Sequence, residues 1–518
     1  MKTVKNAAGR TVPLEIDGVR LRPFAGAHAD EGGERKRTIK IPAAHRYSKK
    51  RLGSLDEAIE ACEIRDGMTI SFHHHLRNGD FLLNRVMNKL AAKGIRDLVL
   101  APSALFPVHE PLVGYLENGV LSHVHGSMNG PVGRACSLGK MKKTAILRSH
   151  GGRYRAIQDG DLQIDVAFIA APCADEHGNA NGLQGPSACG PLGFALADSR
   201  WADRVVVVTD HPVPFPCVPW SIEGGFADHV VVSTEPLGDP EQIVFGTTEI
   251  TRSPTRLMIA DYAARFVAES GLMSEPHFSF QAGAGGISLA FVKAMSGIMA
   301  RDGVTADFIR GGSTRFMVDM LNSGLTRFIL DGQSFDPVSI DSLRENPRHV
   351  ETNPFVSYNI HSKGCFASRV AVAVLGATEI DLNFNVNVNT HSDGWLLHGI
   401  GGFMDAADAQ VTLITAPLVR NRLPIVVDEV TTLTTPGETV DVVVTERGVA
   451  INPARQDLID RMRGSSLPIC KIEQLHEKAT ALCGKPHKPV FGDRIVALVE
   501  YRDGTVIDAV RQVEPSEF

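Results

Sequence analysis

The 518-residue sequence is poor in aromatic residues, which make up 6% of it, and it lacks cysteine pairs and long apolar runs. Its eight cysteines include no Cys-x-x-Cys pair, which argues against a disulfide framework and a thiolate zinc site. The longest apolar runs, such as residues 205–208, fall far short of the roughly 18 residues that cross a bilayer. The first residues also lack the apolar segment of a secretory signal. We therefore predict a cytoplasmic protein with no membrane span and no metal site.

An excess of positive charge is also missing, because 59 acidic residues outweigh 53 Lys and Arg. We therefore expect no nucleic-acid partner and no anionic membrane surface as a partner. Residues 1–51 are the exception, with 13 Lys and Arg against 5 Asp and Glu. Residues 1–50 are rich in Gly and Pro and show no apolar period, so we predict an extended basic arm there. A basic arm of this kind can dock an acidic partner.

After the arm, short β-branched runs alternate with capped helices, which is typical of α/β units with parallel strands. Ser54 and Glu57 have the spacing of a capping box, and Ser253-Pro254 predicts the start of a second long helix. A cluster of Pro, Gly and Asp at 236–240 separates two halves. We predict domains at 51–248 and 249–518. The expected strands lie at 68–72, 98–100, 166–170, 205–209, 278–281, 307–309, 327–330 and 370–375.

The two halves share a pattern at an offset of 206 residues. The run 166–175 aligns without a gap with 372–381, and Asn179 and Asn181 align with Asn385 and Asn387. Each copy leads from a buried strand to an Asp and an Asn-x-Asn loop, whose amides can bond backbone or a polar ligand. Chance matching of apolar runs is the alternative. We favour two similar α/β halves that meet at a shared cleft.

Two glycine-rich segments are candidates for close backbone approach to a ligand. In the segment 399–405, Gly399, Gly401 and Gly402 precede Asp405, and backbone N–H groups there can form an oxyanion hole, although a tight turn is the alternative. Gly283, Gly285 and Gly286 stand between a predicted strand and a helix, but the dinucleotide motif fails at Ser288. A phosphate or pantetheine contact at that helix start remains a candidate.

Two cationic segments are candidates for anion recognition. His73, His74 and His75, followed by Arg77, come at the end of the first strand, where ligands of open α/β sheets collect. The run 149–153 ends in Arg153 and offers a hydroxyl, an imidazole and a guanidinium, which suits carboxylate binding or forms a surface turn. No Gly-x-Ser-x-Gly elbow is present, so a serine nucleophile is not expected.

Together these segments resemble the alpha subunit of citrate lyase over nearly the whole chain. The resemblance lies in residues 66–74, 165–182, 384–388 and 417–420, with 399–405 and 434–450 also similar to coenzyme A transferases and acetyl-CoA hydrolases. It implies two tandem CoA-transferase-like α/β domains of the NagB/RpiA type with parallel-rich sheets, plus the N-terminal arm.

The resemblance also implies an activity and partners. It implies a citrate CoA-transferase that exchanges acetyl for citrate on the CoA-like prosthetic group of an acyl carrier, with CoA as a free equivalent and no tightly bound cofactor. The implied partners are the beta (lyase) and gamma (acyl carrier) subunits, and the isolated chain is expected to form a homo-oligomer. Alternatives are a transferase for citramalate or another small acid, an acetyl-CoA hydrolase, and a non-catalytic scaffold.

Many relatives in the wider superfamily use a glutamate nucleophile, but the comparable stretch here, 311–319, contains no Glu. A covalent glutamyl thioester is therefore not expected. The resemblance to citrate lyase implies direct attack of a citrate carboxylate on the thioester, through a mixed anhydride, with the protein supplying positioning and charge stabilisation. Gly401 and Gly402 would form the oxyanion hole. The expected citrate ligands are His73, His74, Arg77, Arg153 and Arg315, with Arg310 and His75 as further candidates. The expected contacts to CoA or the carrier arm are Gly283, Gly285, Gly286, Asn385, Asn387, Gly399 and Asp405.

Overall fold

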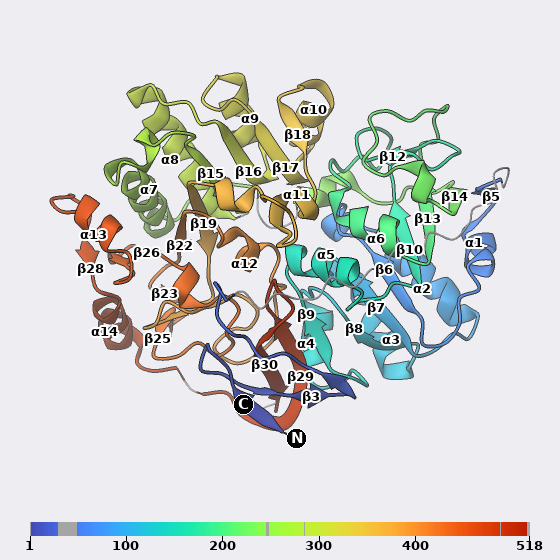
Figure 1. The fold of residues 1–518 in the computed structure, drawn as a ribbon, viewed down its shortest axis with the longest axis horizontal. Helices are drawn as coiled ribbons and strands as arrows, with labels where there is room; N and C mark the ends of the chain where they lie inside the picture. Colours follow the sequence, from blue (N-terminus) through green and yellow to red (C-terminus); the bar gives the residue numbers. More distant parts are fainter. Residues whose placement is uncertain (1, 30–48, 245–247, 284, 487, 515–518) are drawn as a thin grey trace.

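The structure is a computed structural model that describes residues 2–29, 49–244, 248–283, 285–486 and 488–514. Each half of the chain forms one large sheet, and the two sheets stand side by side with helices over their faces (Figure 1). The first sheet is drawn in blue and green and the second in green to red. This arrangement confirms the predicted α/β class.

The first sheet contains seven strands, and every neighbouring pair in it is parallel. Its order is β5 (Arg51–Leu52), β14 (His229–Val232), β13 (Arg204–Thr209), β10 (Val166–Ala170), β6 (Thr69–Phe72), β7 (Leu98–Pro102) and β8 (Leu121–Val124). The helices of this half are α1 (Leu55–Ala61), α2 (Leu82–Ala92), α3 (Leu112–Asn118), α4 (Pro131–Ser137), α5 (His150–Asp159) and α6 (Leu196–Trp201). Ser54 is the N-cap of α1 and accepts the N–H of Glu57, which is one half of the predicted capping box. The Glu57 carboxylate accepts the N–H of Gly53 and not that of Ser54.

The second sheet contains nine strands, and only its β26–β27 pair is antiparallel among the described strands. Its order is β18 (His349–Glu351), β17 (Ile329–Ser334), β16 (Phe308–Ser313), β15 (Ser279–Ala282), β19 (Val372–Gly376), β22 (Val411–Thr415), β26 (Val442–Thr445), β27 (Gly448–Ile451) and β28 (Ile469–Cys470). The helices are α7 (Pro254–Glu269), α8 (Gly286–Asp302), α9 (Arg315–Asn322), α10 (Pro337–Glu345), α11 (Pro354–Tyr358), α12 (Phe403–Ala406), α13 (Gln456–Arg461) and α14 (Ile472–Cys483).

The central strands of both sheets are buried on both faces, because helices or the other half of the chain cover them. One buried apolar cluster contains residues of both halves, such as Phe168 on β10 and Ile414 on β22. A second cluster lies within the second half and includes Phe280 and Phe291. The shared cluster fixes the two halves against each other.

The internal repeat has the same local structure in both halves. The aligned strands β10 and β19 are both interior strands of their sheets. Each is followed by a small antiparallel pair: β11 (Cys173–Ala174) with β12 (Ala180–Asn181), and β20 (Glu379–Asp381) with β21 (Val386–Asn387). Cys173 lies opposite Asn181, and Glu379 lies opposite Asn387, so the register matches at the predicted offset. The repeat is therefore structural and not a chance match.

The N-terminal segment differs from the predicted extended arm. Residues 3–20 form two antiparallel pairs, β1 (Thr3–Lys5) with β2 (Thr11–Pro13) and β3 (Glu15–Ile16) with β4 (Val19–Arg20). They pack beside a C-terminal hairpin, β29 (Phe491–Glu500) with β30 (Val506–Val513), which pairs with β9 (Ala145–Leu147) of the first half. Residues 30–48 of the predicted arm lie outside the described residues.

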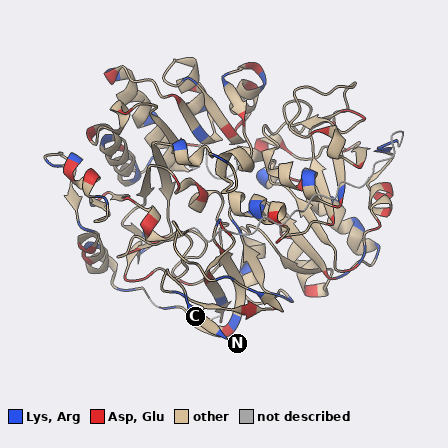
Figure 2. Cartoon of the chain, viewed as in Figure 1, with Lys and Arg blue, Asp and Glu red and all other residues tan. Residues whose placement is uncertain are grey.

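Lys, Arg, Asp and Glu are interspersed over both halves of the described chain (Figure 2). No helix in the described ranges is long and apolar enough to cross a membrane.

Candidate active site

A cleft of about 530 Å³ lies where the two halves of the chain meet. The first half contributes His150 and Phe194 to its wall. The second half contributes the carboxyl ends of β15, β16 and β19, together with residues 398–403. Ligands of α/β sheets collect at these strand ends. Within the described part of the chain, no Asp or Glu lines this cleft.

The glycine loop, residues 399–402, faces this cleft. Gly401 has a φ of +62°, a backbone conformation that favours glycine. Its carbonyl accepts the N–H of His150 at 2.9 Å, which holds the loop against the start of α5. A Cβ on Gly402 would lie 3.2 Å from the hydroxyl oxygen of Tyr358. Among the described residues, no acceptor bonds to the N–H of Gly401 or Gly402. The loop therefore has two backbone donors available at a cleft wall.

Asp405 fixes this loop to the start of α5. Its carboxylate accepts the hydroxyl of Ser149 at 2.9 Å and the N–H of Gly151 at 2.8 Å. Burial raises the pKa of Asp405 to about 6, against the effect of the nearby Arg502. Asp405 does not line the cleft, so the structure places it behind the loop and not at the predicted contact with the carrier arm.

The histidines after β6 lie behind the cleft wall and not on it. The His74 ring stacks on His150 and Phe194, with centroids 5.1 and 4.4 Å apart, and its Nδ1 lies 2.6 Å from the Ser103 hydroxyl. Burial is the main reason why the pKa of His74 is lowered. Burial also lowers the pKa of His150, to about 3. Both rings are therefore neutral at pH 7. The predicted role of His74 in direct binding becomes one of support.

Arg153 and His73 share a buried carboxylate. The guanidinium of Arg153 donates to both oxygens of Asp198 at 2.7 Å, and His73 Nε2 lies 3.1 Å from the same group. The Arg153 and His73 charges lower the pKa of Asp198 despite its burial. Arg153 is thus in a buried ion pair and His73 lies against the same carboxylate, through long-range contacts that the sequence does not reveal.

The other predicted arginines have different surroundings. Arg77 is buried and its guanidinium lies 4.4 Å from the centre of the Phe335 ring, which lines the cleft. Burial lowers the pKa of Arg77 to about 10. Arg310 donates to Gln281 and lies over the Tyr358 ring at 4.6 Å, just under the cleft wall. Arg315 is exposed on α9 and outside the lining, so it does not meet the other candidates.

The glycines predicted to contact the carrier arm differ in whether they line the cleft. Gly283 and Gly399 line the cleft, and Gly285 precedes α8 with a φ of +118°. Gly286 is held by a bond from the N–H of Thr251 and does not line the cleft.

The Asn-x-Asn loop holds itself together instead of lining the cleft. Asn385 bonds to Asp381, and Asn387 bonds to Glu379 and Thr390. The side-chain oxygen of Asn385 accepts the N–H of Gly437, and that of Asn387 accepts the N–H groups of Asn389 and Thr390. Both amides therefore hold backbone, which was the alternative to a ligand role.

Two cleft residues were missed by sequence reasoning. Arg420 and His398 line the cleft from the second half. Arg420 belongs to the segment 417–420 that carries the family resemblance, and His398 directly precedes the glycine loop. Their positions next to two already notable motifs were the available signal.

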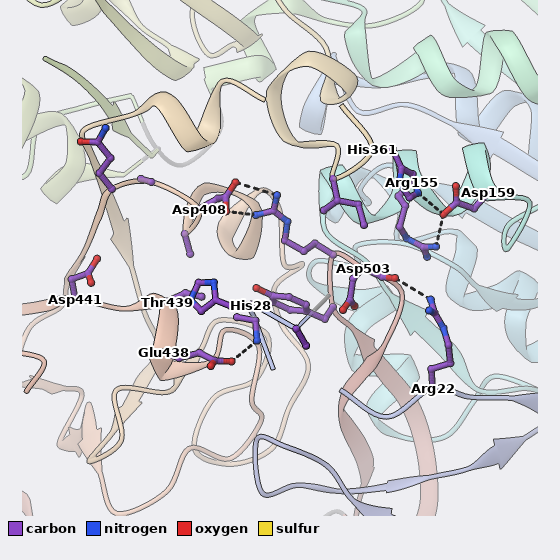
Figure 3. A pocket seen from close by; sticks show the side chains of 18 of the residues that line it. Arg22, His28, Arg155, Asp159, His361, Asp408, Glu438, Thr439, Asp441 and Asp503 are labelled. Atoms are coloured by element: carbon purple, nitrogen blue, oxygen red, sulfur yellow. Dashed lines mark hydrogen bonds and ion pairs between the residues drawn. The ribbon is translucent and has the colours of Figure 1, made fainter. Parts of the chain in front are cut away.

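A larger cavity of about 920 Å³ lies on the other side of α12. Its charged side chains point toward one another, and several are paired (Figure 3). Arg502 pairs with Asp408 at 3.2 Å, Arg155 pairs with Asp159 at 3.1 Å, and Asp441 pairs with Arg455 at 2.6 Å. Because its charges neutralise one another, we assign this cavity to the junction of the chain ends and not to the reaction. In the described ranges, no group of three His, Cys, Asp or Glu side chains is arranged to hold a metal ion.

The chain has a CoA-transferase-like fold. Its fold is similar to that of a 4-hydroxybutyrate CoA-transferase from Porphyromonas gingivalis, with a TM-score of 0.52, 15% identity, and 84% of this chain and 94% of that chain covered. This likeness confirms the predicted CoA-transferase-like fold.

Sequence comparison gives the family. The model of the family described as "Citrate lyase, alpha subunit (CitF)" matches residues 48–513. The citrate lyase alpha chain of Klebsiella pneumoniae is 46% identical over 505 residues, which cover 96% of this chain and 97% of that one. A solved structure of a putative citrate lyase alpha subunit from Streptococcus mutans, in complex with citrate, gives a TM-score of 0.94 at 44% identity and covers 98% of this chain and 100% of that chain. This chain belongs to the citrate lyase alpha subunit family, and the predicted enzyme class, citrate CoA-transferase, is confirmed with it.

Proposed function

We propose that this chain moves an acyl-carrier thiol from acetate to citrate in the cleft between its halves, without a covalent enzyme intermediate. The carrier would be the CoA-like prosthetic group of an acyl carrier subunit, or CoA itself. A lyase subunit would then cleave the citryl thioester. The observation that carries the proposal is the cleft itself. Two backbone N–H groups in its wall form no hydrogen bond within the described residues, and no carboxylate is among its described lining residues.

The reaction has two acyl-transfer steps. A carboxylate oxygen of citrate attacks the thioester carbon, the C–S bond breaks, and the acetyl-citryl anhydride and the thiolate form. The thiolate then attacks the citryl carbonyl of the anhydride, and acetate leaves. Each step places negative charge on a tetrahedral oxygen, which donors held in place before the reaction stabilise. The N–H groups of Gly401 and Gly402 are our candidates for those donors.

Several features support the direct route. An enzyme-bound glutamyl thioester needs a carboxylate in the cleft, and the described lining has none. Gly311 and Gly312 occupy the wall at the end of β16, and the stretch 311–319, which begins within that strand, contains no Glu. A cleft between two packed halves also limits access of water to the thioester and the anhydride.

The first test is the citrate dependence of thioester cleavage. Purified protein with acetyl-CoA should release acetate only when citrate is present. Release without citrate would favour an acetyl-CoA hydrolase. Competition between citrate and citramalate separates the two acids, and a higher kcat/KM for citramalate would overturn the citrate assignment.

The second test addresses the intermediate. On the direct route, pretreatment with acetyl-CoA followed by hydroxylamine or borohydride leaves activity intact, since no acyl-enzyme exists to be trapped. Inactivation would show that a carboxylate outside our assignment acts as nucleophile.

A further inference from the structure

Two cysteines from distant parts of the first half lie next to each other. Cys173 belongs to β11, and Cys217 lies in the loop 211–222 that follows β13. Their Sγ atoms are 3.6 Å apart, although 44 positions separate them in the sequence. All eight cysteines are within the described part of the chain, and no other two of their sulfur atoms form such a contact. The fold therefore creates a thiol pair that cysteine spacing did not indicate.

The groups around this pair favour a thiolate at Cys173. The side-chain amide of Asn181 donates to Sγ of Cys217 at 3.3 Å, and Asp175 accepts the N–H of Cys217 at 2.8 Å. Cys217 is thus held in place with its S–H available to Sγ of Cys173. This hydrogen bond lowers the pKa of Cys173, against burial and the charge of Asp175. A thiolate beside a second thiol is the arrangement of cysteines that oxidise reversibly.

The internal repeat shows what the same position holds in the second half. At the offset of 206 residues, Cys173 aligns with Glu379 and Asn181 aligns with Asn387. The amide of Asn387 donates to the Glu379 carboxylate at 2.8 Å, whereas the amide of Asn181 donates to the sulfur of Cys217. The first half therefore has a thiol pair where the second half has a carboxylate.

The sulfur atoms are buried, but solvent is close to them. Phe215, Val218 and Trp220 of the same loop are exposed on either side of Cys217. A cavity of about 390 Å³ also borders the loop at residues 219–221. A small oxidant therefore reaches the pair through a local opening of the loop. Neither cysteine lines the cleft at the glycine loop, so this chemistry is separate from acyl transfer.

We propose that Cys173 and Cys217 form a site of reversible oxidation, at which hydrogen peroxide converts the two thiols into a disulfide. The Cys173 thiolate attacks one oxygen of the peroxide, the O–O bond breaks, and a sulfenic acid and, after proton uptake, water form. Sγ of Cys217 then attacks the sulfenic sulfur, the S–O bond breaks, and the disulfide and a second water form. The thiols lose two electrons and the peroxide gains them, and both thiol protons end in water.

The disulfide fastens the loop 211–222 to β11. The sulfur atoms must approach from 3.6 Å to bonding distance, and the loop makes this movement because β11 is buried. Further along the loop, Ser221 donates to Glu351 of the second half at 2.6 Å. The oxidised loop is therefore held both to its own half and to the other one.

The test is peptide mapping of the full-length protein after treatment with hydrogen peroxide. We expect one intramolecular disulfide between Cys173 and Cys217, a mass lower by two hydrogen atoms, and full reversal by dithiothreitol. Amide hydrogen exchange over residues 213–221 should slow by about 10-fold, since the cross-link restricts opening of the loop. Free thiols at both positions, or separate oxidation of either one without an S–S bond, would overturn the proposal. Unchanged exchange in the linked protein would overturn the fastening of the loop.

Cys217→Ser isolates the first step, because the serine hydroxyl still donates to Cys173 but cannot form the disulfide. Cys173 should then accumulate as a sulfenic acid that dimedone traps. Equal trapping of Cys217 in Cys173→Ser would overturn the assignment of Cys173 as the attacking thiolate. Cys189→Ser is the matched control, since Cys189 is a buried cysteine of the same half without a sulfur neighbour in the described chain, and it should form the disulfide normally. Thermal unfolding curves show that each variant is folded, and mapping of the unmodified protein decides the proposal without them.

Discussion

At the scale of single residues, Gly402 tests the proposed oxyanion hole directly. A Cβ there lies 3.2 Å from the Tyr358 hydroxyl and 3.4 Å from the His150 ring, and the larger side chain of Gly402→Val must enter the cleft or displace the loop. We expect kcat to fall by about 10²–10³, the loss seen when an oxyanion-hole donor is removed. Steady-state kinetics with acetyl-CoA and citrate measure it.

Gly297→Ala provides the comparison for Gly402→Val. Gly297 lies inside α8, and an added Cβ meets nothing within 4 Å. This variant should keep its kcat and gain about 0.4–1 kcal/mol of unfolding free energy. If Gly402→Val retains the full rate, the glycine loop has no part in the chemistry.

The Arg153–Asp198 pair leads to a prediction about stability. Arg153→Met leaves the buried Asp198 carboxylate with the His73 ring alone, and removal of one partner from a buried pair costs about 3–5 kcal/mol. Urea unfolding at pH 7 should show a loss of that size. Arg153→Lys should recover part of it, since a single ammonium cannot form the bidentate bond.

A selective rise in the KM for citrate in folded Arg153→Met, with unfolding unchanged, would restore the sequence-based role of Arg153. The sequence identified the right kind of side chain but not its partner. Asp198 follows 45 residues later on another helix, and no local pattern connects the two.

At the scale of elements, local sequence patterns predicted the strands and helix starts, because interactions between residues close in sequence determine them. The strands, the N-cap at Ser54 and the proline start of α7 follow from side-chain periodicity and backbone chemistry within a few residues. The repeat at offset 206 correctly aligned two segments of similar structure, although each Asn-x-Asn segment was predicted as a loop and contains a small strand pair. By contrast, the contact between the glycine loop and α5 joins segments about 250 residues apart, and no local pattern indicates it. Asp405 was therefore predicted to contact the carrier arm, whereas it accepts the N–H of Gly151.

That contact gives a pH-dependent prediction for Asp405→Asn. A carboxyl whose pKa is raised to about 6 in the folded protein stabilises the fold most at low pH, and this contribution is lost as pH rises through 6. The stability of the unmodified protein relative to Asp405→Asn should therefore fall by about 2 kcal/mol between pH 4.5 and pH 7.5. Urea unfolding of both proteins at the two pH values measures the difference. Parallel pH curves would show that Asp405 is already ionised in the fold.

At the scale of the whole molecule, the two chain ends meet, and no sequence pattern indicated it. Asn6 donates its side-chain amide to the carbonyls of Val506 and Ile507, 500 residues away. The short strands of the N-terminus have few apolar positions, so their order depends on the hairpin that they cover. Composition predicted an extended arm because it carries no information about contacts with the C-terminal hairpin.

Phe24 tests whether this N-terminal segment is part of the fold or only a docking strip. Its ring is 2% exposed and meets Tyr501 edge to face, with ring centroids 5.0 Å apart. Tyr501 precedes Arg502, which pairs with Asp408 just beyond α12, so the contact lies behind the glycine loop. Phe24→Ala should cost about 3–5 kcal/mol of unfolding free energy and lower turnover with free acetyl-CoA as the loop loosens.

Val19→Ala is the matched control for Phe24→Ala, because Val19 lies in the same segment but is 56% exposed. It should change the unfolding free energy by less than about 0.5 kcal/mol. A docking strip makes the opposite prediction for Phe24→Ala, with unfolding and free acetyl-CoA turnover unchanged and only the reaction with the carrier protein impaired. Urea unfolding and the two activity assays on the same preparations separate these outcomes. Loss of a packing contact lowers the unfolding free energy, whereas loss of a docking contact leaves the unfolding free energy unchanged.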